Sequence, residues 1–163
     1  MKIIDYKDEY NSDLDELQKS VWGDGSDTDE IFDKISDYRV RLVLLTENNE
    51  QKLIGASVSH EIDNEKYFID FIIIKEGYQY KGIGSILMQD IITFAIEKSY
   101  KEISCEAIGV YGKVNSEKLL KNFKFEKQGY YENYWGKKCP DFFCKQCGKK
   151  PCECSMTAYT KFL

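Results

Sequence analysis

The sequence has little histidine or proline and no long apolar run. It contains one histidine and two prolines in 163 residues. No apolar stretch approaches the roughly 20 residues of a membrane-spanning helix, and residues 1–10 lack the apolar segment of a secretory signal. Basic residues number 23 against 28 acidic ones, a net charge of −5. We therefore expect a cytoplasmic protein without membrane or nucleic-acid partners, and the negative charge favours a cationic small molecule or a basic peptide.

The rest of the composition is typical of a globular protein. Hydrophobic residues make up 42% and aromatic residues 14% of the chain, which argues against disorder. A length of 163 residues predicts one domain over 1–163 with a sizeable core. Five of the six cysteines and both prolines fall between 139 and 154, so we expect an insertion there between the last two strands.

Apolar periodicity predicts the order of the elements. Short alternating or apolar runs indicate strands, and apolar stripes of period 3.6 indicate helices. The predicted strands cover 1–7, 41–46, 53–62, 67–75, 102–108, 125–135 and 156–163, and the predicted helices cover 8–22, 30–38, 82–100 and 115–123. An acidic turn over 23–30 is either a solvated loop or an attractor for an amine.

The stretch 68–100 organises the chain, because a strand that is apolar on both faces apart from Asp70 leads through a glycine-bearing turn into an amphipathic helix. The first turn of a helix leaves N–H groups unpaired, and Gly82 and Gly84 would let an anion approach the main chain. We predict a pyrophosphate cradle over 79–85. Lys81 precedes the glycine, which excludes a P-loop, and Leu87 replaces the third glycine of a dinucleotide fingerprint.

The pattern Gln79-x-x-Gly82-x-Gly84 after such a strand resembles the coenzyme A signature of the GNAT superfamily of acyl-CoA N-acyltransferases. The resemblance implies an α+β, three-layer α/β/α domain whose mixed, mostly antiparallel sheet has roughly six to seven strands flanked by about four helices. It implies acetyl-CoA as co-substrate. The residues expected to bind it are Ile72, Ile73, Ile74, Gln79, Tyr80, Lys81, Gly82, Ile83, Gly84, Ser85 and Asn115.

Asp70 is the predicted catalytic base. It lies in an otherwise apolar strand and alternates with Phe68, Ile72 and Ile74, so we expect it on the face that leads to the thioester. Burial would raise its pKa, which suits a base acting directly or through water. A structural ion pair is the alternative. His60, the one histidine, is either structural or a proton shuttle.

The second element of the family pattern is incomplete here. The family places a tyrosine near the end of the following helix, where it protonates the departing thiolate, but Leu120 stands at that place and Lys124 replaces a glycine before Phe125. Tyr111 is a substitute that the spacing does not require. The general acid is therefore left open.

The cysteine-rich segment looks like a zinc knuckle. Cys144-Lys-Gln-Cys147 is followed by glycine, and Cys152 and Cys154 complete four thiolates, with Cys139 as an alternate ligand. Disulfides and free thiols are the alternatives, and a reducing cytoplasm argues against disulfides. Because the set contains no histidine and no open position, we expect the zinc to be structural.

The sequence thus predicts an N-acetyltransferase that moves an acetyl group from acetyl-CoA to a primary amine by direct attack in a ternary complex. The alternative is a non-catalytic acyl-CoA-binding module whose zinc hairpin contacts a partner protein. The amine, a longer acyl donor and a homodimer are left open.

Overall fold

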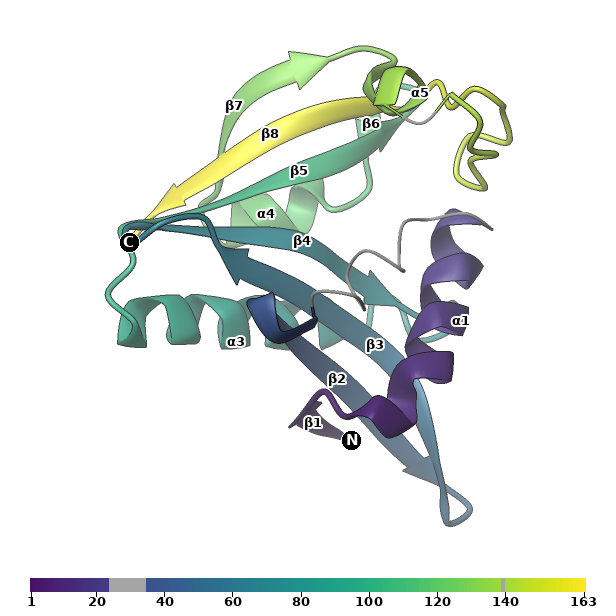
Figure 1. Ribbon diagram of the computed structural model, residues 1–163, viewed down its shortest axis with the longest axis vertical. Coiled ribbons are helices and arrows are strands. Elements are labelled where there is room, and N and C mark those ends of the chain that lie inside the picture. Colours follow the sequence, from purple (N-terminus) through teal and green to yellow (C-terminus); the bar gives the residue numbers. More distant parts are fainter. Residues whose placement is uncertain (24–34, 139) are drawn as a thin grey trace.

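The computed structural model describes residues 1–23, 35–138 and 140–163 (Figure 1). Its strands are β1 (Lys2–Asp5), β2 (Tyr38–Glu47), β3 (Glu50–Glu61), β4 (Lys66–Ile74), β5 (Glu102–Val110), β6 (Lys113–Val114), β7 (Glu126–Tyr131) and β8 (Ser155–Phe162). Its α-helices are α1 (Asn11–Trp22), α3 (Ile83–Glu97), α4 (Glu117–Asn122) and α5 (Tyr134–Lys138). Single 3₁₀ turns cover Asp8–Tyr10 and Ile35–Asp37.

The strands form one mixed sheet in the order β1-β2-β3-β4-β5-β8-β7, with the short β6 added to β5. Every pairing is antiparallel except that of β4 with β5, which α3 connects as a crossover. The sheet therefore has eight strands, one more than expected, because the two-residue β6 was not predicted. None of the helices in the described ranges combines the length and apolar character needed to cross a membrane.

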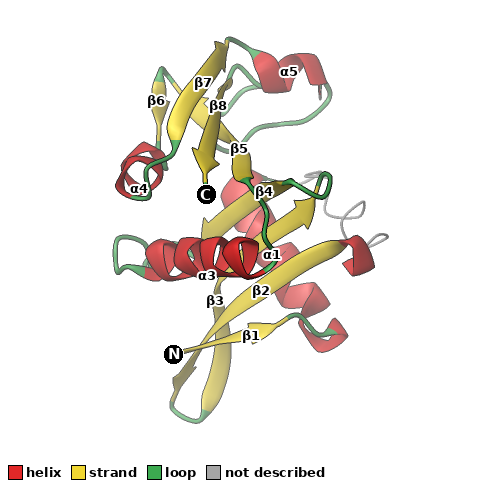
Figure 2. Ribbon diagram, turned by 90° about the vertical axis from the view of Figure 1, so that its left-hand side faces the viewer, coloured by secondary structure: helices red, strands yellow, loops and turns green. Residues whose placement is uncertain are grey.

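Helices cover the two faces of the sheet, as expected for three layers (Figure 2). On one face, Leu14 and Leu17 of α1 are buried against β2, β3 and β4. On the other face, Met88 and Ile91 of α3 pack on β4 and β5 together with Leu120 of α4. The i, i+3 spacing of these apolar residues gives each helix one core-facing side.

Some element boundaries differ from the predicted ones for local backbone reasons. Asn48 and Asn49 both have positive φ, so a two-residue turn joins β2 to β3 and both strands are longer than expected. Ser99, at φ 65°, turns the chain after α3, so the helix ends before the predicted Tyr100. Asn133, at φ 50°, ends the predicted strand 125–135 early, and α5 follows.

The predicted helix 30–38 lies mostly outside the described residues. Of its range, the structure describes only the 3₁₀ turn over Ile35–Asp37 and then Tyr38, which already belongs to β2. The acidic turn over 23–30 also lies outside the described residues, apart from Gly23.

Candidate active site

The site begins where β4 and β5 stop pairing. Their parallel register runs from Lys66 opposite Glu102 to Ile69 opposite Cys105 and ends there. Beyond this point the two strands diverge, β4 continuing beside β3 and β5 beside β8 (Figure 1). The inner edge of β4 beyond Ile69 therefore has no partner strand among the described residues, and that of β5 has none over 106–108, before β6 pairs with Gly109 and Val110. The backbone groups of these free edges can bind an extended ligand.

Asp70 lies at this divergence and is the extra residue of a β-bulge in β4. Ser59 of β3 pairs with Ile69, and Val58 pairs with Phe71, so Asp70 has no opposite residue. The bulge interrupts the alternation that we expected along β4. Ile72 and Ile74 pack toward α3, whereas Asp70 turns to His60 on the other side of the sheet. The prediction that Asp70 shares a face with Ile72 and Ile74 is therefore wrong.

Asp70 and His60 form a pair at the sheet surface. The Nδ1 atom of His60 lies 2.8 Å from the Oδ2 atom of Asp70, and the two side chains are 29% and 21% exposed. Burial raises the pKa of the Asp70 carboxyl, and the hydrogen bond and charge of His60 lower it in part. Such a partly desolvated carboxylate is a better proton acceptor than a surface aspartate.

Aromatic rings hold this pair in place. The His60 ring contacts Tyr38 at 5.2 Å and Phe68 at 5.5 Å between centroids, since the three residues lie opposite one another on β2, β3 and β4. The ring of Phe71, the residue that follows Asp70, meets Trp22 of α1 edge to face at 5.1 Å. The end of α1 thus packs on the neighbour of Asp70 in the chain.

The glycine-bearing turn that follows β4 leaves the start of α3 free for a ligand. Gly82 is the N-cap at φ 83°, and it makes no side-chain cap to the N–H groups of the first turn. A Cβ atom on Gly82 would meet no other atom within 4 Å, so the main chain is open to solvent there. This geometry suits a phosphate anion.

The other residues of the predicted cradle divide into core and surface. The side chain of Ile83 is buried, so only its main chain can reach a ligand. Tyr80 is fully exposed at φ 61°, and Lys81 lies over the Tyr78 ring. Gln79 donates through Nε2 to the carbonyl of Ile74 at 3.2 Å, which ties the turn to the end of β4.

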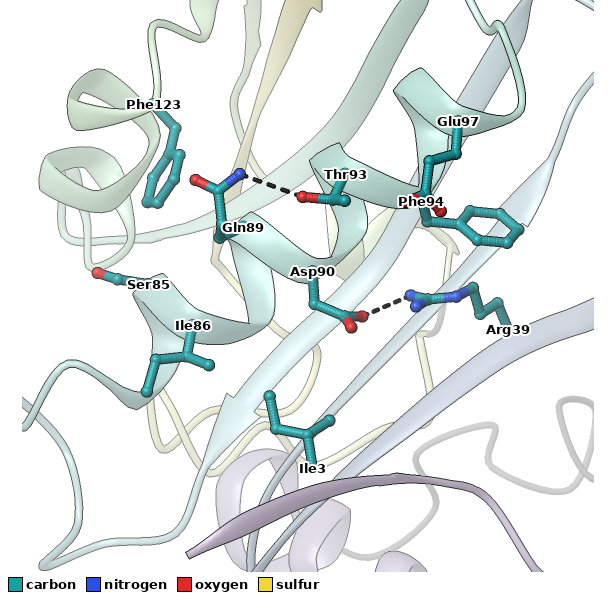
Figure 3. Close-up of a pocket in the computed structure, with 10 residues that line it drawn as sticks. All are labelled: Ile3, Arg39, Ser85, Ile86, Gln89, Asp90, Thr93, Phe94, Glu97 and Phe123. Carbon is teal, nitrogen blue, oxygen red and sulfur yellow. Dashed lines mark hydrogen bonds and ion pairs between the residues drawn. The ribbon is translucent and has the colours of Figure 1, made fainter.

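A hollow follows the exposed side of α3, as Figure 3 shows. Ser85 lies at its start, and Asp90 points across it to Arg39 of β2, 2.7 Å from Nη1. Arg41 approaches the same carboxylate at 3.3 Å. Neither Asp70 nor His60 lines this hollow, so it is separate from the predicted base.

The two positions considered for the general acid, Leu120 and Tyr111, offer no free tyrosine hydroxyl. Asn115 is exposed between β6 and α4, outside the helix. Leu120 is 2% exposed and belongs to the core under α4. The hydroxyl of Tyr111 donates a hydrogen bond to the carbonyl of Cys147 at 3.1 Å, so Tyr111 contacts the cysteine hairpin over 140–154.

The four cysteines predicted as metal ligands lie together and are buried. All their Sγ atoms fall within 4.8 Å of one another, with Cys144 to Cys154 at 3.8 Å and Cys147 to Cys152 at 3.9 Å. Gly148, at φ 68°, donates its N–H to the carbonyl of Cys144, which closes the turn between the first two cysteines. Cys139 lies outside the described residues.

Two features of the site did not follow from the sequence. The Asp70–His60 contact depends on the bulge, and a one-residue offset in register has no signature in the sequence. The contact of the cysteine hairpin with α1 joins residues 125 apart in the chain. Only the position of His60 on the strand before Asp70 hinted at the first contact.

A family model described as acetyltransferase (GNAT) family matches residues 6–125. No curated protein matched. A GNAT family acetyltransferase from Elizabethkingia anophelis with acetyl-CoA bound superposes with a TM-score of 0.69 at 23% identity, covering 99% of this chain and 97% of that one.

Further solved structures agree in fold. A Bacillus subtilis acetyltransferase in complex with CoA has a TM-score of 0.73 at 18% identity, covering 99% of this chain and 98% of that one. An aminoglycoside 6'-N-acetyltransferase from Enterococcus faecium has a TM-score of 0.71 at 8% identity and covers 99% and 97%. The predicted fold and family resemblance are thereby confirmed. Since the family model spans 120 of the 163 residues, this chain belongs to the acetyltransferase (GNAT) family.

Proposed function

We propose that this protein transfers an acetyl group from acetyl-CoA to a primary amine by direct attack in a ternary complex, with Asp70 as the base. The observation that carries the proposal is the partly buried Asp70–His60 pair at the divergence of β4 and β5, on the strand that runs into the open glycine turn. Coenzyme-bound relatives of the same fold support the donor. A cytoplasmic location belongs to the same proposal.

The chain supplies three groups to this reaction. The N–H groups after Gly82 would bind the pyrophosphate, and the free edge of β4 over Ile72–Ile74 would hold the pantetheine arm. Asp70 would attract the cationic amine by its charge and then accept the proton that the amine must lose before or during attack. His60 would orient that carboxylate and restrain its pKa.

Direct attack is favoured over an acyl-cysteine intermediate. Among the described cysteines, Cys105 lies at the divergence, opposite Ile69. Burial raises the pKa of its thiol to about 12, with a smaller contribution from Glu106, so the thiol stays protonated and is a poor nucleophile. The clustered cysteines are buried against one another.

The amine acceptor is proposed to be a small cationic molecule or a basic peptide. The net charge of −5 and the carboxylate of Asp70 support a positively charged acceptor. Among the solved structures of the same fold is an aminoglycoside 6'-N-acetyltransferase, and the name of that enzyme describes transfer to an amine. A panel of polyamines, aminoglycosides, amino acids and peptides covers these classes.

The second candidate is a non-catalytic acyl-CoA-binding module. It is favoured by the buried Leu120 at the place of the family's tyrosine and by the engagement of Tyr111 with the carbonyl of Cys147. In this case the cysteine hairpin would bind a partner protein. Binding of acetyl-CoA without turnover on any amine of the panel would support this second candidate.

The test combines calorimetric titration with acetyl-CoA and release of free thiol against the amine panel. We expect acetyl-CoA to bind and at least one amine to be acetylated. We also expect double-reciprocal plots of the initial rate to give intersecting lines when both substrates are varied. Parallel lines, together with an acetylated cysteine in the mass spectrum, would overturn direct attack. His60→Gln is expected to keep most of the turnover, and a loss as large as that of Asp70→Asn would transfer the role of base to His60.

A further inference from the structure

We propose that Cys144, Cys147, Cys152 and Cys154 hold one zinc ion, and that this metal-bound hairpin clamps the C-terminal end of α1. The hairpin over 140–154 lies beside that end of the helix, although the two are far apart in sequence (Figure 1). This metal site and this mechanical role belong to a segment that the acetyl-transfer chemistry does not use.

The sulfur positions match one tetrahedral metal. A zinc ion with four Zn–S bonds of about 2.3 Å requires sulfur–sulfur distances of about 3.8 Å. The observed Cys144–Cys154 and Cys147–Cys152 distances are 3.8 and 3.9 Å. A disulfide would need about 2.05 Å, and the structure records all four residues as free cysteines.

Binding would convert four thiols into thiolates and release four protons, giving a site with a net charge of −2. The fold supplies a hydrogen-bond donor for this charge. The backbone N–H of Cys154 points at the Sγ atom of Cys152 at 3.4 Å. This donor orients one sulfur ligand, as hydrogen bonds around metal sites do.

The hairpin has little else to order it. In the part of the chain that the structure describes, four partly buried apolar side chains pack against the four buried cysteines, and these are Ile108, Val110, Trp135 and Phe142. So small a cluster cannot offset the conformational entropy of the hairpin, whereas four metal–sulfur bonds can. The metal would therefore decide whether the hairpin is folded.

The folded hairpin satisfies the last carbonyl groups of α1. The backbone N–H of Lys145 donates to the carbonyl of Trp22 at 3.0 Å, and its Nζ donates to Ser20 at 2.7 Å. The Nε2 atom of Gln146 donates to Val21 at 2.5 Å. These carbonyls have no partner inside the helix, and the positive charge of Lys145 also suits the helix C-terminus.

The contact between the hairpin and α1 is connected to the predicted base through Trp22 and Phe71. Trp22, whose carbonyl the hairpin binds, packs its ring on Phe71, the residue that follows Asp70. Release of the metal should loosen the end of α1 and its packing on Phe71, next to Asp70 in the chain. In its effect on catalysis this inference rests on the proposed function, and there it predicts a higher KM for the amine with little change in acetyl-CoA binding.

The experiment measures metal content and hydrogen exchange on the full chain, so it does not depend on acetyl transfer. Protein purified under reducing conditions should contain one zinc per chain. After removal of the metal by a chelator, amides of residues 17–23 should exchange at least about tenfold faster, while those of α3 stay unchanged. Re-addition of zinc should restore the protection.

Two variants separate the clamp from the metal. Lys145→Ala combined with Gln146→Ala should keep one zinc but lose protection at residues 17–23. Lys150→Ala, which removes an exposed ion pair with Asp141, is the matched control and should keep both. A chain without zinc, equimolar iron in its place, or zinc removal that leaves α1 as protected as before would each overturn the proposal. If the zinc-bound wild type shows the expected hydrogen exchange but no turnover on any amine, that result would instead count against the proposed function.

Discussion

Replacement of Asp70 by asparagine should change stability in a pH-dependent way that reveals its raised pKa. Burial is the larger influence on this carboxyl, and the hydrogen bond from His60 opposes it only in part. Between the ordinary pKa of an aspartate and the raised value, the folded protein holds a proton that the unfolded chain has released. The free energy of unfolding of the wild type therefore falls as pH rises through this window.

The size of the effect follows from the local contacts. Asparagine has the shape of aspartate and can keep a hydrogen bond to Nδ1 of His60, so the charge-assisted part of that 2.8 Å contact is what is lost. The desolvation cost of the charge is lost as well. We expect a net change in unfolding free energy within about 1 kcal/mol near neutral pH, or a shift of about 2–4 °C in Tm.

The assay is urea unfolding of wild type and Asp70→Asn over a series of pH values. The stability of the variant relative to the wild type should grow as pH rises through the window, with a slope of at most about 1.4 kcal/mol per pH unit, and then stay constant. In a His60→Gln background this growth should be larger, because the group that lowers the pKa of Asp70 is gone. A difference that is flat, or that shrinks with rising pH, would refute the raised pKa.

Three further substitutions test other parts of the account. Asp90→Ala leaves Arg39 and Arg41 without their shared partner between β2 and α3, and since these side chains are about one-fifth exposed we expect a loss of about 2–3 kcal/mol in urea unfolding. Gly82→Val should weaken acetyl-CoA binding in calorimetry far more than Gly77→Val, which has the same positive φ and equally open surroundings but lies outside the cradle. Leu120→Tyr should lower the free energy of unfolding by about 1–3 kcal/mol by overpacking the core and should not raise turnover above that of the wild type. Higher turnover would instead indicate that a tyrosine at this position acts as the general acid.

The sequence predicted the parts of the fold that depend on local patterns. The apolar strand before Gly82 and the stripe of α3 follow from periodicity, and the glycine pair marks the turn between them. The spacing of the four cysteines alone was enough to predict that they lie together. These features need no knowledge of distant contacts.

Features that depend on register or on distant contacts could not be predicted. The bulge at Asp70 changes the direction of one side chain, and strand periodicity says nothing about a single inserted residue. The donation from Gln146 to Val21 joins segments 125 residues apart, and neither segment has a pattern that names the other. The short helix α5 occupies residues that were predicted to end a strand. Its start follows the positive φ of Asn133, which the sequence pattern did not indicate.

The proposed role of Asp70 is to accept the proton when the acetyl group passes from acetyl-CoA to an amine. It is tested most directly by free-thiol release from saturating acetyl-CoA with an amine that the wild type accepts, comparing wild type with Asp70→Asn. We expect kcat/KM to fall by about 10²–10⁴-fold while the Kd for acetyl-CoA is unchanged. Equal turnover by the two proteins at equal coenzyme binding would contradict it.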